Sequence, residues 1–410
     1  MLTPPARRPL SRSRRGSTAP RTWRWDSPAR YDRVVDRIRT VGLSWEGKAD
    51  LLAAGDGAPS TVPRRTWSTD DGGSSLLEGD NLDCLLRLAS EAPDRAALAY
   101  LDPPFFTNRE HQAWLRKAGS PRGAGRTRVP AFDDRWPDLQ AWLDALGRRL
   151  AAVRRLLAPH GSIVVHVDPK TSHYVKVLGD EIFGWDAFAS EIVWRYRRWP
   201  SKTPNFQRVH DVLLRWRKDP RAAPRWNQPY EPLAASTLAT WGTNKQRAVF
   251  DAAGRRRRSS STEERTRGVP MGDVWDIGVI APISRERTGY PSQKPEALLE
   301  RLLRALSDPG DLVVDPYAGS GTTLAVAWRL RRRFIGIDAS PVAIEIVRAR
   351  VAELGAELRP QAGPGGGGTA DPATPRAAAS ARQNNQKRTK RDCDSETNRD
   401  TVPALGGVSL

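Results

Sequence analysis

The sequence predicts an α/β protein with a twisted, mainly parallel β-sheet and helices on both of its faces. Short apolar runs of strand length alternate along the chain with segments of helical periodicity, which is the pattern of successive β-α-β units. The 410 residues, 39% of them hydrophobic, are also sufficient to bury a large core. No internal repeat is visible.

The first half of the chain predicts two strands separated by a helix. Residues 96–101 are apolar and end at Asp102, which indicates a buried strand. Leucine, tryptophan and valine residues then recur at steps of three and four over 138–157, which indicates a helix. Proline and glycine at 159–161 should end this helix, and the apolar run 162–167 predicts the next strand.

The second half predicts the same alternation at closer spacing. The expected elements are, in order, a helix over 296–306, a strand over 312–315, a glycine-rich turn, a helix over 322–331, a strand over 334–338 and a helix over 341–354.

The charge of the chain is strongly positive and unevenly distributed. There are 66 Lys and Arg against 47 Asp and Glu, a net charge of +19 that favours a polyanion such as nucleic acid or an acidic membrane surface. Residues 1–40 carry +8, residues 190–270 carry +11 and residues 359–410 carry +3, so the remaining body of the chain is near −3. The excess cations therefore lie outside the predicted α/β core.

The basic block 190–270 also holds many aromatic residues. Mixtures of cations and rings suit phosphate contacts combined with stacking or wedging at bases, although some of the rings must belong to the core. The residues that we expect to contact nucleic acid are Arg195, Arg197, Arg198, Lys202 and Arg208, and the interleaved aromatic residues are Trp194, Tyr196, Trp199, Phe206, Trp216, Trp226 and Trp241.

Several other classes of protein are excluded or disfavoured. Two cysteines, Cys84 and Cys393, cannot form a disulfide framework or a cysteine zinc site, and the five histidines are scattered without a ligand cluster, so we expect no metal. No run approaches 18 consecutive apolar residues and the N-terminus has no apolar signal segment. These features predict a cytoplasmic protein with no membrane partner.

A glycine turn follows the strand expected at 312–315. The phosphate-binding loop of a nucleoside triphosphatase would have a lysine directly after Gly321, and this chain has none. A dinucleotide-binding fingerprint would have its third glycine where Leu324 stands. What remains is a G-x-G turn, then a helix, a strand and Asp338, 19 residues after Gly319. An acid at the end of the second strand can hydrogen-bond ribose hydroxyls, so the pattern predicts binding of a nucleoside.

The motif Asp102-Pro103-Pro104-Phe105 follows the strand expected at 96–101, at the edge where open α/β sheets bind ligands. The two prolines restrict the backbone and so hold an acid and an aromatic ring over the same opening. The Asp102 carboxylate and the Pro103 carbonyl can both accept the hydrogens of an exocyclic amino group, while Phe105 stacks on the base.

These motifs together give a resemblance to a known family. From about Leu76 to Leu354 the chain resembles the S-adenosylmethionine-dependent DNA methyltransferases that modify amino groups, in the permuted order in which the catalytic loop precedes the cofactor loop. The ordered segments that carry the resemblance are 77–82, 102–105, 132–134, 161–168, 209–211, 293–295, 315–322 and 336–338. A Rossmann-like methyltransferase fold with an inserted target-recognition region is therefore implied.

The resemblance also implies roles for individual residues. The catalytic residues would be Asp102, Pro103, Pro104 and Phe105, and the cofactor-binding residues would be Asp80, Asn81, Lys294, Asp315, Tyr317, Gly319, Ser320, Gly321, Thr322 and Asp338. The chain departs from the family pattern at two positions, since Tyr317 stands where phenylalanine is usual and Tyr290 where histidine is frequent.

The resemblance implies a domain organisation that agrees with the charge distribution. Residues 41–189 would form the catalytic half, 190–270 the inserted target-recognition region and 271–358 the cofactor-binding half. Residues 1–40 are expected to be a disordered basic arm and 359–410 a disordered tail, because both have little to bury.

The function implied is transfer of a methyl group from S-adenosylmethionine to N6 of adenine in double-stranded DNA, after extrusion of the base. Alternatives that stay open are cytosine N4 methylation, methylation of RNA or a small molecule, and a catalytically silent DNA-binding relative. A cognate restriction endonuclease and a homodimer are compatible with the sequence, which specifies neither.

Overall fold

The computed structural model describes residues 42–46, 48, 50, 57–116, 125–200, 202, 204–241, 248–258 and 267–361. The arm expected over 1–40 lies outside these residues, as does the tail expected from 359 onward apart from its first three residues. The chain divides into two units, 1–363 and 364–410, and only the first contains described residues.

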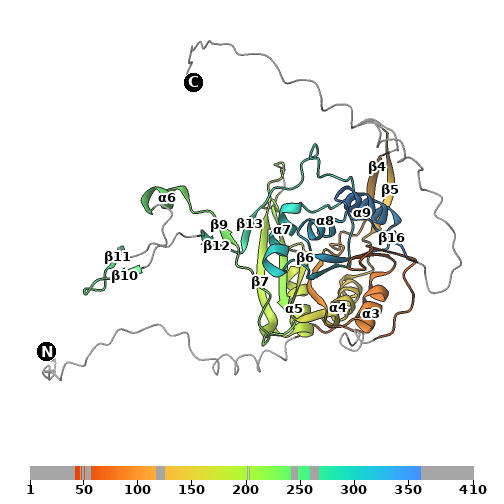
Figure 1. The fold of residues 1–410 in the computed structure, drawn as a ribbon, viewed down its shortest axis with the longest axis horizontal. Coiled ribbons are helices and arrows are strands. Elements are labelled where there is room, and N and C mark those ends of the chain that lie inside the picture. The colour runs from red at the N-terminus through yellow and green to blue at the C-terminus, as the bar shows by residue number, and fades with distance from the viewer. Residues whose placement is uncertain are drawn as a thin grey trace, which may run out of the picture. The chain divides into compact units, whose positions relative to one another are not determined.

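A ten-stranded mixed sheet forms the centre of the first unit (Figure 1). Its order is β13-β7-β8-β6-β3-β14-β15-β2-β1-β16, and the five adjacent strands from β6 to β2 run parallel. These ten strands are β1 (Arg65–Ser68), β2 (Ser75–Glu78), β3 (Ala96–Leu101), β6 (Leu157–Val167), β7 (Phe188–Arg195), β8 (His210–Arg217), β13 (Val274–Asp276), β14 (Leu312–Asp315), β15 (Arg333–Asp338) and β16 (Arg359–Pro360). The predicted mainly parallel α/β fold is confirmed.

Helices cover both faces of this sheet, as Figure 1 shows. On one face lie α3 (Asn81–Glu91), α4 (Leu139–Leu156) and α5 (Ser172–Phe183), and on the other lie α7 (Glu296–Leu306), α8 (Thr322–Arg329) and α9 (Pro341–Glu353).

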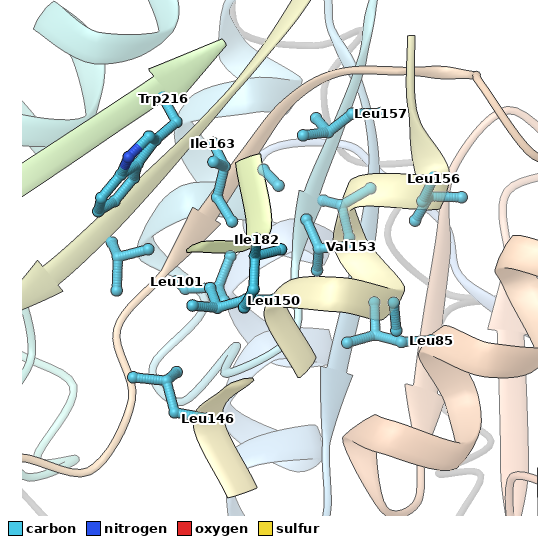
Figure 2. Packing of buried hydrophobic residues seen from close by; sticks show 14 of the residues in the cluster. Leu85, Leu101, Leu146, Leu150, Val153, Leu156, Leu157, Ile163, Ile182 and Trp216 are labelled. Atoms are coloured by element: carbon cyan, nitrogen blue, oxygen red, sulfur yellow. The ribbon is translucent and has the colours of Figure 1, made fainter. Parts of the chain in front are cut away.

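Successive side chains of a strand point to opposite sides of the sheet, and helices cover both sides. Both faces of the central strands are therefore buried. In β3, Leu101 packs against the α3–α5 layer, whereas Leu98 and Tyr100 pack against the α7–α9 layer. Figure 2 shows the first of these cores, in which Leu101 and Trp216 of the sheet meet the helical side chains of Leu150 and Ile182. The continuous apolar runs that predicted the strands follow from this two-sided burial.

The remaining elements are smaller. A separate hairpin, β4 (Glu110–Arg116) and β5 (Arg126–Asp133), follows the loop after β3. The segment between β8 and β13 holds β9 (Tyr230–Glu231), α6 (Ala235–Trp241), β10 (Ala248–Phe250), β11 (Arg256–Arg258) and β12 (Val269–Pro270), with β9 paired to β12 and β10 to β11.

The structure corrects three of the expected boundaries. Strand β6 begins at Leu157, so residues 159–161 belong to the strand and do not separate it from the preceding helix. The pairing of β6 with β3 is irregular at this segment. Residues 359 and 360 form β16, because their backbone pairs with the otherwise open edge of β1. Strands β7 and β8 lie within the central sheet although they fall in the block 190–270, so an insertion outside the sheet starts only after β8.

Candidate active site

A row of aspartates lies along one edge of the sheet. Each of the five parallel strands ends at this edge in an aspartate or is followed by one, and the antiparallel strand β8 begins there with His210 and Asp211. A cavity of about 740 Å³ runs along the edge, within the size range of small-molecule sites. The acids of these six strands that line it are Asp80, Asp338, Asp315, Asp102, Asp168 and Asp211, and Asp133 and Asp134 line it as well.

The loop Asp102–Phe105 is held from two sides. Asp134 is fully buried and its carboxylate accepts the backbone N–H groups of the two residues after the loop, at 3.1 and 2.7 Å. On the other side, the indole N–H of Trp142 in α4 donates to the carbonyl of Pro104 at 2.9 Å. The loop is therefore preorganised by buried partners as well as by its prolines.

Lys294 pairs with Asp102 in this loop. Its Nζ lies 2.7 and 2.6 Å from the two carboxylate oxygens and 4.9 Å from the centre of the Phe105 ring. The Lys294 backbone carbonyl accepts the hydroxyl of Thr322, at the start of α8, at 3.2 Å. The sequence placed Lys294 among the cofactor residues, but its ammonium group contacts the predicted catalytic carboxylate.

The glycine turn between β14 and α8 requires its glycines. Gly319 and Gly321 have φ angles of +50° and +72°, which residues with a Cβ atom rarely adopt. A Cβ on Gly319 would also lie 3.1 Å from the ring of Tyr290. The N–H of Gly319 donates to Asp338 Oδ2 at 2.8 Å, so the turn and the acid expected to act with it are in direct contact.

Two of the carboxyl groups at this edge have raised pKa values. Burial raises the pKa of Asp315 to about 7, and the negative charges of Asp102 and Asp338 add to the effect, although a hydrogen bond from the N–H of Tyr317 opposes it. Burial likewise raises the pKa of Asp338 to about 6. Acids perturbed in this way in a cavity are typical of functional sites.

One end of the cavity, on the β2 side of the sheet, is lined by a cluster around Arg149 of α4. The Arg149 guanidinium donates to Asn81 Oδ1 at 2.5 Å and to Asp80 Oδ2 at 3.3 Å. Asn81 Nδ2 donates to the carbonyl of Pro316 at 2.9 Å, and Asp80 caps α3. These two expected cofactor-binding residues are thereby tied to the segment that leads into the glycine turn.

The other end contains a buried polar chain behind Phe105. Nδ1 of His166 and the hydroxyl of Tyr100 are 2.8 Å apart, and Nε2 of His166 lies 3.4 Å from Asp211 Oδ2. Tyr196 donates its hydroxyl to the other oxygen of Asp211 at 2.9 Å. Burial lowers the pKa of His166, which favours a neutral ring.

The structure brings most of the predicted site residues to one cavity. Of the residues expected to be catalytic or to bind cofactor, Gly321 alone does not line it. Of the expected DNA contacts, Arg198 and Arg208 line it, Arg197 and Lys202 are exposed outside it, and Arg195 forms an ion pair with Asp276.

Some residues of the cavity had no role in the sequence interpretation. Asp168 had the signal that identified Asp102, since it directly follows an apolar strand, and Asp211 lay in a recognised segment to which no role was given. Arg149 lies on a helix face among other arginines and had no distinguishing signal.

Two features are absent from the described residues. No group of three or more His, Cys, Asp or Glu side chains among them could hold a metal ion. No helix in the described part of the chain is both long and apolar enough to cross a membrane.

Comparison with known proteins shows the family to which the chain belongs. Residues 96–349, more than half of the chain, match the model of the N6/N4 methyltransferases, described as DNA methylase. The chain belongs to this DNA methylase family. The match extends from the start of β3 to α9 and so includes both the Asp102 loop and the glycine turn.

Individual DNA methylases are similar over much of their length. Type II methyltransferase M.EcaI of Enterobacter cloacae is 29% identical over 330 residues, which cover 68% of this chain and 69% of the relative. DNA adenine methyltransferase YhdJ of Escherichia coli K12 is 27% identical over 265 residues, which cover 64% and 78%. Among solved structures, the cytosine-N4-specific PvuII DNA methyltransferase gives a TM-score of 0.44 at 19% identity and covers 71% of this chain and 89% of that one.

The raised pKa of Asp315 predicts how the stability of this DNA methylase depends on pH. Between pH 4 and 7 the folded protein holds the Asp315 proton more tightly than the unfolded chain, so this group stabilises the fold as the pH falls. The free energy of unfolding of the parent, relative to Asp315→Asn, should therefore increase from pH 7 to pH 5, by at most about 1.4 kcal/mol per pH unit. Urea unfolding at pH 7, 6 and 5 measures the difference.

The control is Asp273→Asn, which removes an exposed carboxylate and should give the same difference from the parent at each pH. A parent-minus-Asp315→Asn difference that does not change with pH, or that increases toward pH 7, would contradict the assignment of a protonated Asp315.

Proposed function

We propose that the protein transfers a methyl group from S-adenosylmethionine to the N6 amino group of adenine in double-stranded DNA. The observation that carries this proposal is that the Asp102 loop and the glycine turn with Asp338 open into the same cavity. Membership of the DNA methylase family supplies the reaction class, and the name of the relative YhdJ favours adenine.

The cavity fits the chemistry of S-adenosylmethionine. This cofactor carries an ammonium group, a positively charged sulfur and one carboxylate, so it is a cation overall. The cavity is lined by eight aspartates against five lysine and arginine side chains, in a chain whose net charge is +19. Opposite charges within a partly buried site attract strongly, so a small cationic ligand is favoured there. We assign Asp338, which lines the cavity beside Gly319, to the ribose hydroxyls of the cofactor.

Asp102 is the residue that we assign to the target amino group. A carboxylate has about four lone-pair positions, and Lys294 uses one on each oxygen, so Asp102 can accept a hydrogen of the amino group while it stays paired. Phe105 offers a ring on which the extruded base stacks, and Trp142 and Asp134 prevent the loop from moving away.

The transfer requires no covalent intermediate with the protein. When bound, the cofactor supplies a methyl group that is activated by the adjacent positive sulfur. The amino nitrogen forms a bond to this methyl group as the bond from carbon to sulfur breaks. The electron pair of that bond leaves with S-adenosylhomocysteine, and the nitrogen then releases one of its protons to solvent. Asp102 and the Pro103 carbonyl stabilise the positive charge that develops on the nitrogen.

A cysteine nucleophile, as methylation of cytosine C5 would need, is disfavoured. Cys84 is 1% exposed in the core beside Leu85, and burial raises its pKa to about 12. Cys393 lies outside the described residues. The thiol that the structure describes is therefore neither accessible nor ionised near neutral pH.

Methylation of cytosine N4 is the second candidate, because the amino group of cytosine makes the same hydrogen-bond demands on Asp102 as that of adenine. The motif with aspartate before the two prolines favours adenine. A cognate restriction endonuclease, a homodimer, target recognition by residues 190–270 and a cytoplasmic location remain predictions.

The first test identifies the product. Purified protein is incubated with unmodified duplex DNA and S-adenosylmethionine, and the DNA is digested to nucleosides for mass spectrometry. We expect N6-methyl-2′-deoxyadenosine. N4-methylcytosine instead would refute the choice of base but keep the class, and unmodified DNA of every sequence tested would refute the class.

The second test separates chemistry from cofactor binding. Asp102→Ala should reduce single-turnover methylation at saturating cofactor by about 100-fold or more, because it removes an acceptor at the reacting nitrogen, while cofactor affinity changes little. Asp338→Ala should first weaken cofactor binding, by about 1–3 kcal/mol, because it leaves buried hydroxyl groups without partners. Calorimetric titration with S-adenosylhomocysteine and rapid-quench methylation measure the two effects.

Asp273→Ala, which removes an exposed aspartate outside the cavity, serves as the control for both measurements. Methylation by Asp102→Ala at the parent rate, or unchanged cofactor affinity in Asp338→Ala, would show that these roles belong to other residues.

A further inference from the structure

The loop between β7 and β8 starts at the rim of the active site. Strands β7 and β8 pair up to Arg195 and His210, and the N–H of Tyr196 donates to the carbonyl of Val209 at 2.8 Å, which extends the pairing by one step. Within the loop, Gln207 Nε2 donates to the carbonyl of Trp199 at 2.7 Å. The loop is thus a continuation of the hairpin with a closed base.

The base of this loop is fastened to the aspartates of the cavity. Arg208 Nη1 lies 2.7 Å from Asp168 Oδ2, at the end of β6. The Arg198 guanidinium donates to the Tyr196 hydroxyl at 3.1 Å and lies over its ring at 5.0 Å. Asp168 follows β6 and Asp102 follows β3, and these two strands are neighbours in the sheet. The base of the loop is therefore fastened one strand away from Asp102.

Two aromatic rings of the loop are almost completely exposed to solvent. Trp199 is 91% exposed and Phe206 is 105% exposed, whereas Trp194 and Tyr196 of the preceding strand and its extension are only 3% and 2% exposed. The structure therefore divides the aromatic residues of this segment into core rings and rings that nothing in the described chain covers. Two large exposed rings that line the same hollow indicate a binding surface.

The surroundings of these rings indicate the kind of partner. A second hollow, of about 700 Å³, lies between them and is lined by Arg197, Arg198 and Arg208. Arg198, Arg208 and Val279 line this hollow and the active-site cavity alike, so the two adjoin. Cations beside exposed rings, next to a cavity that receives a base, match the phosphates and base faces of DNA.

We propose that Trp199 and Phe206 form a wedge that enters the base stack of DNA and occupies the space left by the extruded target base. This inference rests on the proposed DNA methylation. Extrusion breaks a base pair and two stacking contacts, and an inserted ring replaces part of the lost stacking. The fastened base of the loop gives the rings a defined position relative to Asp102.

The test compares three substrates of one sequence, in which the target base faces its normal partner, a mismatched base or an abasic site. On the paired duplex, Trp199→Ala/Phe206→Ala should methylate about 10-fold or more slowly than the parent in single turnover. On the abasic substrate, where little pairing has to be broken, the variant should approach the parent rate. With 2-aminopurine at the target position, the variant should also give a smaller rise in fluorescence on binding the paired duplex.

Trp185→Ala is the matched control, because Trp185 is a 41% exposed tryptophan that precedes β7 and so lies toward the opposite edge of the sheet. It should behave as the parent on all three substrates. Equal rates of the double variant and the parent on the paired duplex, or an equal loss on all three substrates, would overturn the wedge. A parent that methylates none of the three substrates would refute the proposed function itself, so the two failures are distinguishable.

Discussion

The structure depends on how five carboxylates are accommodated along one edge of a sheet. Parallel strands place their carboxyl ends side by side, so the aspartates that end or follow β2, β15, β14, β3 and β6 are brought together by topology rather than by sequence proximity. Their repulsion and loss of hydration are compensated in different ways. Arg149, Lys294 and Arg208 pair with Asp80, Asp102 and Asp168, and backbone N–H groups donate to Asp315 and Asp338.

This difference in compensation separates the chemistry of the two halves of the cavity. Asp315 and Asp338 have backbone donors in place of a paired cation, and burial raises the pKa of both. Asp102 has the ammonium group of Lys294 and retains lone pairs for a ligand. The cavity is acidic on balance, with eight aspartates against five lysine and arginine side chains, whereas three arginines and no acid of the described chain line the adjoining hollow. The hollow therefore suits a polyanion and the cavity a small cation.

The sequence predicted the elements with strong local patterns and missed those that depend on tertiary pairing. Residues 296–306 and 312–315 have the expected bounds, because a leucine-rich helical period and a short apolar run each specify one structure. Strands β7 and β8 were assigned to a recognition block because cations dominate its average composition, although Trp194 and Trp216 inside them are core residues. The pairing of Lys294 with Asp102 joins residues 192 positions apart and left no trace in the sequence.

We propose that one cavity holds the cofactor and the target base side by side. The most direct measurement is a calorimetric titration with a conjugate that joins N6 of adenosine through a short linker to the sulfur position of the cofactor. If both halves enter the cavity together, the conjugate should bind about 100-fold or more tightly than S-adenosylhomocysteine, because the second half binds without a further loss of translational freedom. An affinity equal to that of S-adenosylhomocysteine would show that the base is held elsewhere and would contradict the account.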